Sequence, residues 1–427
     1  MTHTLTSSTL RAASWDEIRD LFAATPGTIH LNTGTVGVMP HAVLEEYDRM
    51  TREWTGGLAD IYRPTMFTEH RTAIGRSYGA DVDEIVITHN TTEAVARIIN
   101  GLELGSDDEA IATTHECYSV LSNFNLVRNR FGLSLKVLTP PSGYHVSAEE
   151  IVALFEDAIT PRTKVLAFSA VSLWTGTLMP VRAICELAHR HGLITVIDGA
   201  LISGMLNVNL RESGADFIAC SGSKYQCGPL GSGILYIRNK VLPDCSPLPL
   251  PTLWPIISTW YPMIGDTPPR SATSVESYNI ADYLQSAGSA NIARGGALAK
   301  ACTMWDEIGR DRIESRVMEL GDHARERVLE RFGENSMYSP CSDKRLRSPL
   351  VAFNPFREAA DAWNVKKITA LTDILAAEHR IWIRWTEFDV PDSPHQHYAA
   401  RICTHIFNDY DQIDRAVTTI ATVAEKL

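Results

Sequence analysis

A lysine and an aspartate carry the chemistry that this sequence most clearly predicts. Lys224 stands in the turn CSGSKYQCGPLGSG directly after an apolar run, and Asp198 ends the apolar run LITVID, 26 residues earlier. Glycines and serines keep the backbone around Lys224 open, which favours a ligand-binding turn over an ordinary solvated lysine. A buried carboxylate can keep a pyridine nitrogen protonated, and a lysine amine can hold an aldehyde as a Schiff base. The pair therefore predicts a site for pyridoxal 5'-phosphate (PLP).

The residues around Lys224 should tune its amine and help to bind the cofactor. Burial and a nearby cation both disfavour a charged lysine, so we expect a lowered pKa for Lys224. Ser221 and Ser223 flank the lysine and offer hydroxyl groups to a ligand. The glycines of 228–233 do not form a dinucleotide fingerprint, because they precede a predicted strand and not a helix.

A phosphate site is predicted at the start of a helix. Thr91 and Thr92 follow the strand pattern EIVITHN and open the helical pattern TTEAVARIINGLEL. Hydroxyls and free N–H groups at a helix N-terminus bind anions, although helix capping explains these threonines about as well. Together with Ser221 they predict a phosphate cradle at the carboxyl ends of parallel strands, where α/β sheets bind ligands. Asp198 also follows a strand, and capping of a following helix is its alternative role.

Alternating strand and helix patterns should position these residues. From about residue 70 to Asp198, apolar runs typical of strands alternate with helical patterns, which predicts an α/β fold with a mostly parallel sheet covered on both faces. The runs DFIACSG and GILYIRN continue the sheet on either side of Lys224. Residues 241–275 are rich in Pro and Trp without a period, which indicates a loop.

The length of the chain favours a division into parts. At 427 residues it exceeds the size to which a single core usually grows. We expect an N-terminal arm over residues 1–40, a large PLP-binding domain over 41–295, and a small α+β C-terminal domain over 296–427.

The composition of the chain argues against several classes of binding partner. The formal net charge is −12, and no run of Lys and Arg is interleaved with aromatics, so we expect no nucleic-acid partner. No signal peptide and no apolar run of about 18 residues is visible, so we expect no membrane partner and a cytoplasmic location. The eight cysteines form no C-x-x-C pair, which fits reduced thiols. His395 and His397 have no third ligand at metal spacing, so we expect no metal.

Taken as a set, the motifs resemble the fold-type I, class-V aminotransferase family, which includes cysteine desulfurases, isopenicillin N epimerase and several C–S lyases. The resemblance spans nearly the whole chain and is carried by LNTGTVGVMP, THNTTEAV, SAVSLWTGTLMPV, VIDGA, SGSKYQCGPLGSGILYIRN, SAGSAN and RICTHIFNDYDQID. It implies the fold of a fold-type I PLP-dependent transferase. It also implies that Lys224 forms the Schiff base, that Asp198 contacts the pyridine nitrogen, and that Thr91, Thr92 and Ser221 lie near the phosphate.

The resemblance further implies residues from other parts of the chain. Gly288 and Ser289 match a pair that reaches the phosphate of the neighbouring subunit, which implies a homodimer with shared active sites. Arg401 matches the arginine that binds the carboxylate of the amino-acid substrate, as a guanidinium fork does well. The residue stacked on the ring is His115 or Tyr118, depending on how THECYS is aligned. Thr35 and Trp174 are further candidates for substrate binding.

Several positions depart from the family pattern. Ser223 stands where a histidine is usual, Leu201 replaces a glutamine or histidine, and Leu173 replaces an asparagine. The catalytic cysteine of desulfurases is missing between Arg384 and Arg401, and Cys403 falls in a predicted strand.

The vacant cysteine position disfavours a desulfurase. We therefore predict a PLP-dependent C–S β-lyase, or a related decarboxylating deaminase, that acts on a cysteine S-conjugate in antibiotic biosynthesis. This choice follows the resemblance to the epimerase-like branch of actinomycete secondary metabolism, including lincosamide-type pathways. An amino-acid epimerase or an aminotransferase would keep the same residues. A non-enzymatic PLP-binding regulator is a further alternative, although the first 30 residues cannot hold a helix-turn-helix.

Overall fold

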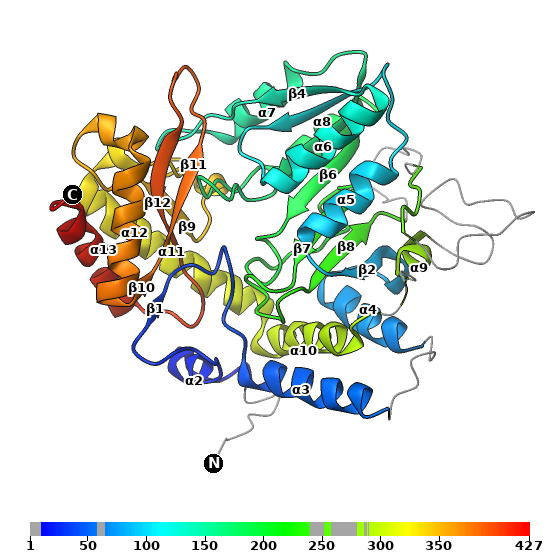
Figure 1. The fold of residues 1–427 in the computed structure, drawn as a ribbon, viewed down its shortest axis with the longest axis horizontal. Helices are drawn as coiled ribbons and strands as arrows, with labels where there is room; N and C mark the ends of the chain where they lie inside the picture. Colours follow the sequence, from blue (N-terminus) through cyan, green and yellow to red (C-terminus); the bar gives the residue numbers. More distant parts are fainter. Residues whose placement is uncertain (1–9, 58–64, 240–251, 258–279, 286–287, 289) are drawn as a thin grey trace, which may run out of the picture.

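The computed structural model describes residues 10–57, 65–239, 252–257, 280–285, 288 and 290–427. They form a large unit, built on a seven-stranded sheet with its helices, and a small unit, built on a three-stranded sheet with its helices (Figure 1). Most of the predicted loop 241–275 and all of Ser289 lie outside the described residues. Within the described residues, no helix combines the length and apolar character needed to cross a membrane.

The large sheet is mostly parallel, as predicted. Its strand order is β2-β8-β7-β6-β5-β3-β4, and β8 alone runs antiparallel to its neighbours. DFIACSG and GILYIRN form the adjacent strands β7 and β8, so the turn with Lys224 connects two neighbours in the sheet. The strands are β2 (Ile85–Thr88), β3 (Glu109–Thr113), β4 (Ser134–Leu138), β5 (Thr163–Ser169), β6 (Ile194–Gly199), β7 (Phe217–Ser221) and β8 (Gly233–Ile237).

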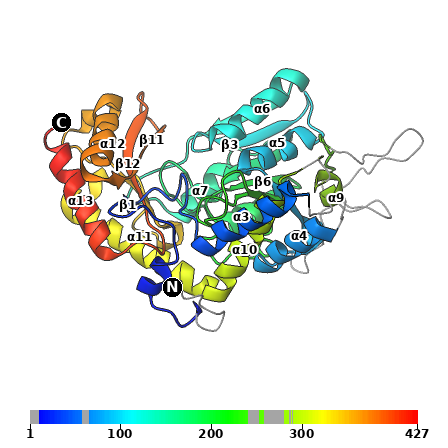
Figure 2. The ribbon, with the colours of Figure 1, turned by 60° about the horizontal axis from the view of Figure 1, so that its bottom comes forward.

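Both faces of this sheet are buried, which explains its nearly continuous apolar strands. Val165 and Ala167 of β5 face one core, shared with α5 and α6, whereas Leu166 and Phe168 face the opposite core, shared with α7, α8 and α10. Figures 1 and 2 show α3, α4 and α10 side by side. The helices of the large unit are α3 (His41–Thr55), α4 (Thr65–Ser77), α5 (Thr91–Gly101), α6 (Tyr118–Phe131), α7 (Ala148–Glu156), α8 (Val181–Arg190), α9 (Ile280–Gln285) and α10 (Ile292–Ile308).

The small unit carries an antiparallel sheet in the order β11-β12-β9. Gly309, with a φ of 101°, separates α10 from α11, and α11 then packs on α13 and β9. The predicted boundary at 295/296 falls inside α10, and the domain division stays a prediction. The elements are α11 (Arg310–Phe332), β9 (Leu350–Phe353), α12 (Val365–His379), β10 (Ile381–Trp382), β11 (Arg384–Phe388), β12 (His397–Cys403) and α13 (Tyr410–Ala424).

The N-terminal arm connects the two units. It holds α2 (Trp15–Arg19) and β1 (Ile29–His30), which pairs in parallel with β10 of the small unit. Further along, the Gly37 N–H donates to the Ser223 carbonyl at 2.8 Å. A Cβ on Gly37 would lie 2.0 Å from the Lys224 carbonyl oxygen, so only glycine permits this approach. The arm therefore packs directly on the turn that carries the lysine.

A buried histidine of the small unit braces the same turn. His405 Nδ1 accepts a hydrogen bond from the Ile406 N–H at 2.8 Å, so Nε2 carries the proton and donates to the Tyr225 carbonyl at 2.9 Å. Burial lowers the pKa of His405 from its usual 6.5 to about 4. The ring is therefore neutral at physiological pH.

We expect His405 to make the folded chain sensitive to acid. Because its pKa is lower in the folded than in the unfolded chain, its contribution to the free energy of unfolding is complete above pH 6.5 and is lost as the pH falls toward 4. The full loss corresponds to about 3 kcal/mol. Urea unfolding of the cofactor-free protein between pH 7 and pH 4.5 measures it. His405→Gln should flatten this pH dependence and exposed His191→Gln should not; equal slopes in both variants would contradict the assignment.

Candidate active site

Lys224 and Asp198 meet at the carboxyl ends of adjacent parallel strands. Asp198 lies on β6, paired with Ala219 of β7, and Lys224 follows the end of β7 by three residues. No α-helix follows Asp198 for it to cap; its Oδ1 instead accepts a hydrogen bond from the Ala200 N–H at 2.9 Å. The arrangement brings one acidic and one basic side chain together inside the protein.

The electrostatics of this pair match the expectation from the sequence. Burial raises the pKa of Asp198, and the nearby Lys224 opposes that rise. Burial also lowers the pKa of Lys224, against the attraction of Asp198. The positive charge of Arg401 lowers the pKa of Lys224 further, and Arg401 is thus the nearby cation that we expected from the sequence. The amine of Lys224 is more easily neutralised than a surface lysine, as a nucleophilic lysine requires.

The start of α5 offers an unused hydroxyl. Asn90 caps the helix, since its Oδ1 accepts from the Glu93 N–H at 2.9 Å, so capping does not account for the threonines. Thr91 is buried, and its Oγ1 has no hydrogen-bond partner within the described part of the chain. Thr92 is exposed at the same helix end. A buried hydroxyl without a partner at a helix N-terminus fits a phosphate ligand.

The serines beside Lys224 form a small polar turn. Ser221 Oγ accepts from the Ser223 N–H at 3.3 Å and lies 3.5 Å from Ser223 Oγ, while the Ser221 carbonyl accepts from Ser203 Oγ at 2.6 Å. These hydroxyls have capacity left for a further acceptor. With the orphaned Thr91 hydroxyl and the Asp198–Lys224 pair, the donors of this site fit PLP.

Arg401 is held by three residues from two other segments of the chain. It lies on β12 with no exposed surface, and its Nη1 donates to the Leu173 carbonyl at 2.7 Å. Its Nη2 donates to Asn32 Oδ1 and Thr35 Oγ1, each at 3.2 Å. Its buried Nε has no partner among the described residues. Thr35 therefore positions the guanidinium, and Leu173 serves through its backbone where the family has an asparagine side chain.

The two candidates for ring stacking take different positions. His115 is buried, with Nε2 2.9 Å from the Asp389 carbonyl oxygen, and burial lowers its pKa. Tyr118 is 60% exposed at the start of α6, and its hydroxyl donates to Glu387. Cys117 lies between them, is only partly buried, and belongs to the ionisable groups that act on Lys224. The choice between His115 and Tyr118 therefore stays a prediction, and Cys117 is a further group near Lys224 that the sequence did not mark.

The predicted residue Trp174 lies at the site together with Glu116 and Arg384, which the sequence did not mark. Trp174 is buried, and its Nε1 donates to the carbonyl of Glu116 at 3.1 Å. Glu116 is itself buried beside Asp198. Arg384 is the register partner of Arg401 across β11 and β12. No spacing in the sequence marks Glu116, and the pairing of Arg384 with Arg401 depends on the antiparallel register of β11 and β12.

Three further residues considered in the sequence lie within the described part of the chain. Gly288 is exposed with a φ of 87°, and because its neighbour Ser289 is outside the described residues, the shared phosphate contact stays a prediction. Cys403 is fully buried at the end of β12. His397 Nδ1 lies 2.9 Å from the Tyr338 hydroxyl, and its Nε2 lies 3.0 Å from Ser393 Oγ. Within the described residues, the only cluster with metal-like spacing is Asp81, Asp83 and Glu84.

Comparison with known proteins gives one family. Residues 38–362 match the family model Aminotransferase class-V. The chain is 27% identical over 410 residues to isopenicillin N epimerase of Streptomyces clavuligerus, covering 95% of this chain and 97% of the relative. It is 28% identical over 339 residues to a probable cysteine desulfurase of Halalkalibacterium halodurans, covering 76% and 77%.

Solved structures share the fold. A cystine C–S lyase, solved in complex with cysteine persulfide, superposes with a TM-score of 0.74 at 20% identity, covering 93% of this chain and 98% of that one. A cysteine desulfurase from Thermococcus onnurineus gives 0.73 at 21% identity, covering 96% and 98%. These likenesses confirm the predicted fold. With the family match, they lead to one conclusion: the chain belongs to the class-V aminotransferase family and is an enzyme that acts on amino acids with pyridoxal 5'-phosphate as its cofactor.

Proposed function

We propose that this enzyme is a lyase that breaks the Cβ–S bond of an S-substituted cysteine, or deaminates such a substrate, in secondary metabolism. The observation that carries the proposal is the vacant position of the desulfurase cysteine: residues 385–400 hold no cysteine, Cys403 is fully buried, and the partly buried Cys117 lies outside this stretch. A persulfide-forming desulfurase needs an accessible thiolate to accept sulfur. A lyase needs none, because the sulfur leaves with the rest of the substrate.

Arg401 holds the substrate carboxylate in this proposal. The Leu173 carbonyl and the side chains of Asn32 and Thr35 fix its plane, so little conformational entropy is lost when a carboxylate binds. Its unpartnered Nε gives a buried donor for one carboxylate oxygen. A fixed carboxylate also fixes which bond at Cα faces the cofactor ring.

Lys224 moves the proton in this proposal. PLP, when bound, supplies an electron sink for the Cα carbanion. Lys224 Nζ takes the Cα proton, and the carboxylate of Asp198 would stabilise a protonated pyridine nitrogen. The Cα electron pair forms a Cα–Cβ double bond, the Cβ–S bond breaks, and sulfur leaves as a thiolate that takes up a proton. Hydrolysis of the remaining enamine gives pyruvate and ammonia.

Removing the guanidinium should damage turnover more than cofactor binding. Arg401→Leu is expected to lower kcat/KM by about 2–4 kcal/mol in transition-state terms, because charge-assisted hydrogen bonds contribute roughly 1.5–3 kcal/mol each. Arg401→Lys should recover only part of this, since an ammonium cannot bind a carboxylate bidentately. Steady-state kinetics and cofactor absorbance measure the effects. Exposed Arg357→Leu is the control, and unchanged kinetics in Arg401→Leu would remove its role.

The reaction can be identified from its products. Purified holoenzyme is incubated with S-alkyl and S-glycosyl cysteines, and thiol, ammonia and keto acid are quantified. A lyase gives thiol, ammonia and keto acid in equal amounts. Alkylation of cysteines outside the pocket should not change its activity. Carbon dioxide with an aldehyde that keeps the sulfur would indicate the decarboxylating deaminase, which needs a two-electron oxidant such as dioxygen. Alanine with a protein-bound persulfide would contradict the proposal.

An epimerase is the second candidate, because the relative from Streptomyces clavuligerus is named isopenicillin N epimerase and aligns over nearly its full length. It would return the D-amino acid with solvent deuterium at Cα and release no thiol. An aminotransferase would instead need a keto-acid partner. We keep the homodimer with shared sites as a further proposal, tested by the molar mass of the holoenzyme in solution.

A further inference from the structure

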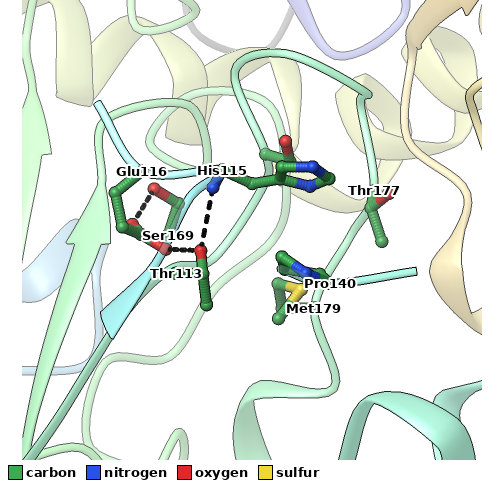
Figure 3. A pocket seen from close by; sticks show the side chains of 8 residues that line it. Thr113, His115, Glu116, Pro140, Ser169, Thr177 and Met179 are labelled. Carbon is green, nitrogen blue, oxygen red and sulfur yellow. Dashed lines mark hydrogen bonds between the residues drawn. The ribbon is translucent and has the colours of Figure 1, made fainter. Parts of the chain in front are cut away.

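Glu116 is a buried carboxyl group without a cationic partner, next to the cofactor site. Only 2% of its surface is exposed. Its Oε1 is hydrogen-bonded to Thr113 Oγ1 at 2.5 Å, and its Oε2 to Ser169 Oγ at 2.6 Å, so either hydroxyl can accept a hydrogen bond from a protonated carboxyl group (Figure 3). Among the described residues it forms no ion pair with an arginine, lysine or histidine. Burying an isolated charged carboxylate costs much free energy, so a group in this position tends to be neutral.

Its two hydroxyl partners lie at the ends of strands in the same sheet as Asp198. Thr113 ends β3 and Ser169 ends β5, and Ser169 is the register partner of Asp198 on β6. The negative charge of Asp198 acts on Glu116, and two interacting carboxylates inside a protein are not both charged without a penalty. Asp198 is the one with a cation, because Lys224 lies nearby. Glu116 is therefore the one that keeps its proton.

The charged groups around Glu116 agree with this assignment. Burial raises the pKa of Glu116 to about 8, the negative charge of Asp198 adds to the rise, and the hydroxyls of Ser169 and Thr113 only partly oppose it. A small cavity of about 10 Å³ beside the group has one other titratable lining residue, His115. Burial lowers the pKa of His115, and its Nε2 faces the Asp389 carbonyl, so it supplies no positive charge.

Glu116 also fixes the turn that enters the site. Thr113 Oγ1 donates to its carboxyl group and at the same time accepts from the His115 N–H at 3.2 Å (Figure 3). The Glu116 carbonyl accepts from the Trp174 indole. The next residues are Cys117 and Tyr118, which face Lys224 and Glu387. Any shift of Glu116 would move these side chains.

We propose that Glu116 is a positioning residue that acts as a neutral carboxylic acid, holding the turn 115–118 in place and leaving Asp198 as the carboxylate that would stabilise a protonated pyridine nitrogen. The inference rests on the cofactor site and is independent of which bond at Cα breaks. It predicts that the shape and hydrogen bonding of the Glu116 side chain matter and that a negative charge there does not.

The first test uses the melting temperature of the cofactor-free protein between pH 4.5 and 9. Because the pKa of Glu116 is raised in the folded chain, its stabilising effect is full below pH 4.5 and is lost as the pH rises to about 8. The difference in melting temperature between wild type and Glu116→Gln should therefore fall across this range and level off above it. A difference that is independent of pH would overturn the proposal.

The second test uses the holoenzyme at pH 7. Glu116→Gln should keep the dissociation constant for PLP within about threefold and keep most of kcat, since the amide is neutral and of similar shape. Glu116→Ala should weaken PLP binding by more than tenfold. Loss of PLP binding in the Gln variant, or tight binding in the Ala variant, would overturn the proposal. Glu109→Gln is the matched control, because Glu109 also accepts hydroxyls from two threonines, at the opposite end of β3.

A third variant keeps the proposal testable if the Gln variant does not fold. Ser169→Ala removes a hydroxyl that favours the charged form of Glu116. The alkaline end of the wild-type stability profile should then move to higher pH. A shift to lower pH, or none, would contradict a protonated Glu116. The stability profiles and the PLP dissociation constants do not depend on C–S cleavage, so a failure of the proposed reaction remains distinguishable.

Discussion

Replacing Lys224 by alanine is expected to abolish covalent attachment of PLP and to lower kcat by on the order of 10²–10⁴-fold, the range for loss of a proton-transferring side chain. Lys224 is the only lysine that the structure places beside Asp198 within the described residues. Burial lowers its pKa, so the neutral, nucleophilic amine is more accessible than that of a surface lysine. Visible absorption of the purified protein, and borohydride reduction followed by peptide mass mapping, measure the attachment.

The control for this experiment is an exposed lysine on the same sheet. Lys164→Ala on β5 should keep the visible absorption, the reducible adduct and full turnover. Lys224→Ala should still bind PLP without a covalent bond, because it leaves Asp198 and the predicted phosphate donors at the start of α5 in place. A borohydride-stable adduct on another lysine of the variant would show that Lys224 was wrongly assigned.

Much of the fold and the centre of the site could be predicted because they depend on short stretches of sequence. Apolar runs such as KVLAFSAV are buried on both faces in β5, which is the pattern of a parallel sheet. Asp198 and Lys224 each follow such a run, and strands that are adjacent and parallel bring their ends together. The positions of these two residues therefore follow from local pattern and sheet topology alone.

Other features depend on contacts between distant segments and could not be predicted. Arg401 is oriented by Asn32, Thr35 and Leu173, which are 228 to 369 residues away in the chain. Glu116 shows its role only through its burial and its position beside Asp198. The ambiguity between capping and phosphate binding at α5 was also undecidable locally, because it required knowing that the Asn90 side chain makes the cap.

The second large effect is expected from Asp198→Asn, which should still bind PLP and lose on the order of 10²–10⁴-fold in kcat. Loss of one partner from a buried charge pair typically costs about 3–5 kcal/mol, and each 1.36 kcal/mol corresponds to tenfold in rate. Asparagine keeps an oxygen for the Ala200 N–H, so the turn after β6 should stay intact. It carries no charge to favour a protonated pyridine nitrogen, without which the ring is a poor electron sink.

Two measurements separate this electrostatic effect from damage to the fold. Asp108→Asn is the matched control, because Asp108 Oδ2 also accepts a backbone N–H, from Gly105 at 3.0 Å, in the loop before β3. It should keep wild-type rates. In Asp198→Asn, the PLP dissociation constant should rise only moderately while kcat falls. Near-wild-type turnover would exclude Asp198 as the partner of the ring nitrogen. It would also remove the functional reason for a neutral Glu116, because Asp198 would then not be needed as the charged carboxylate at the cofactor.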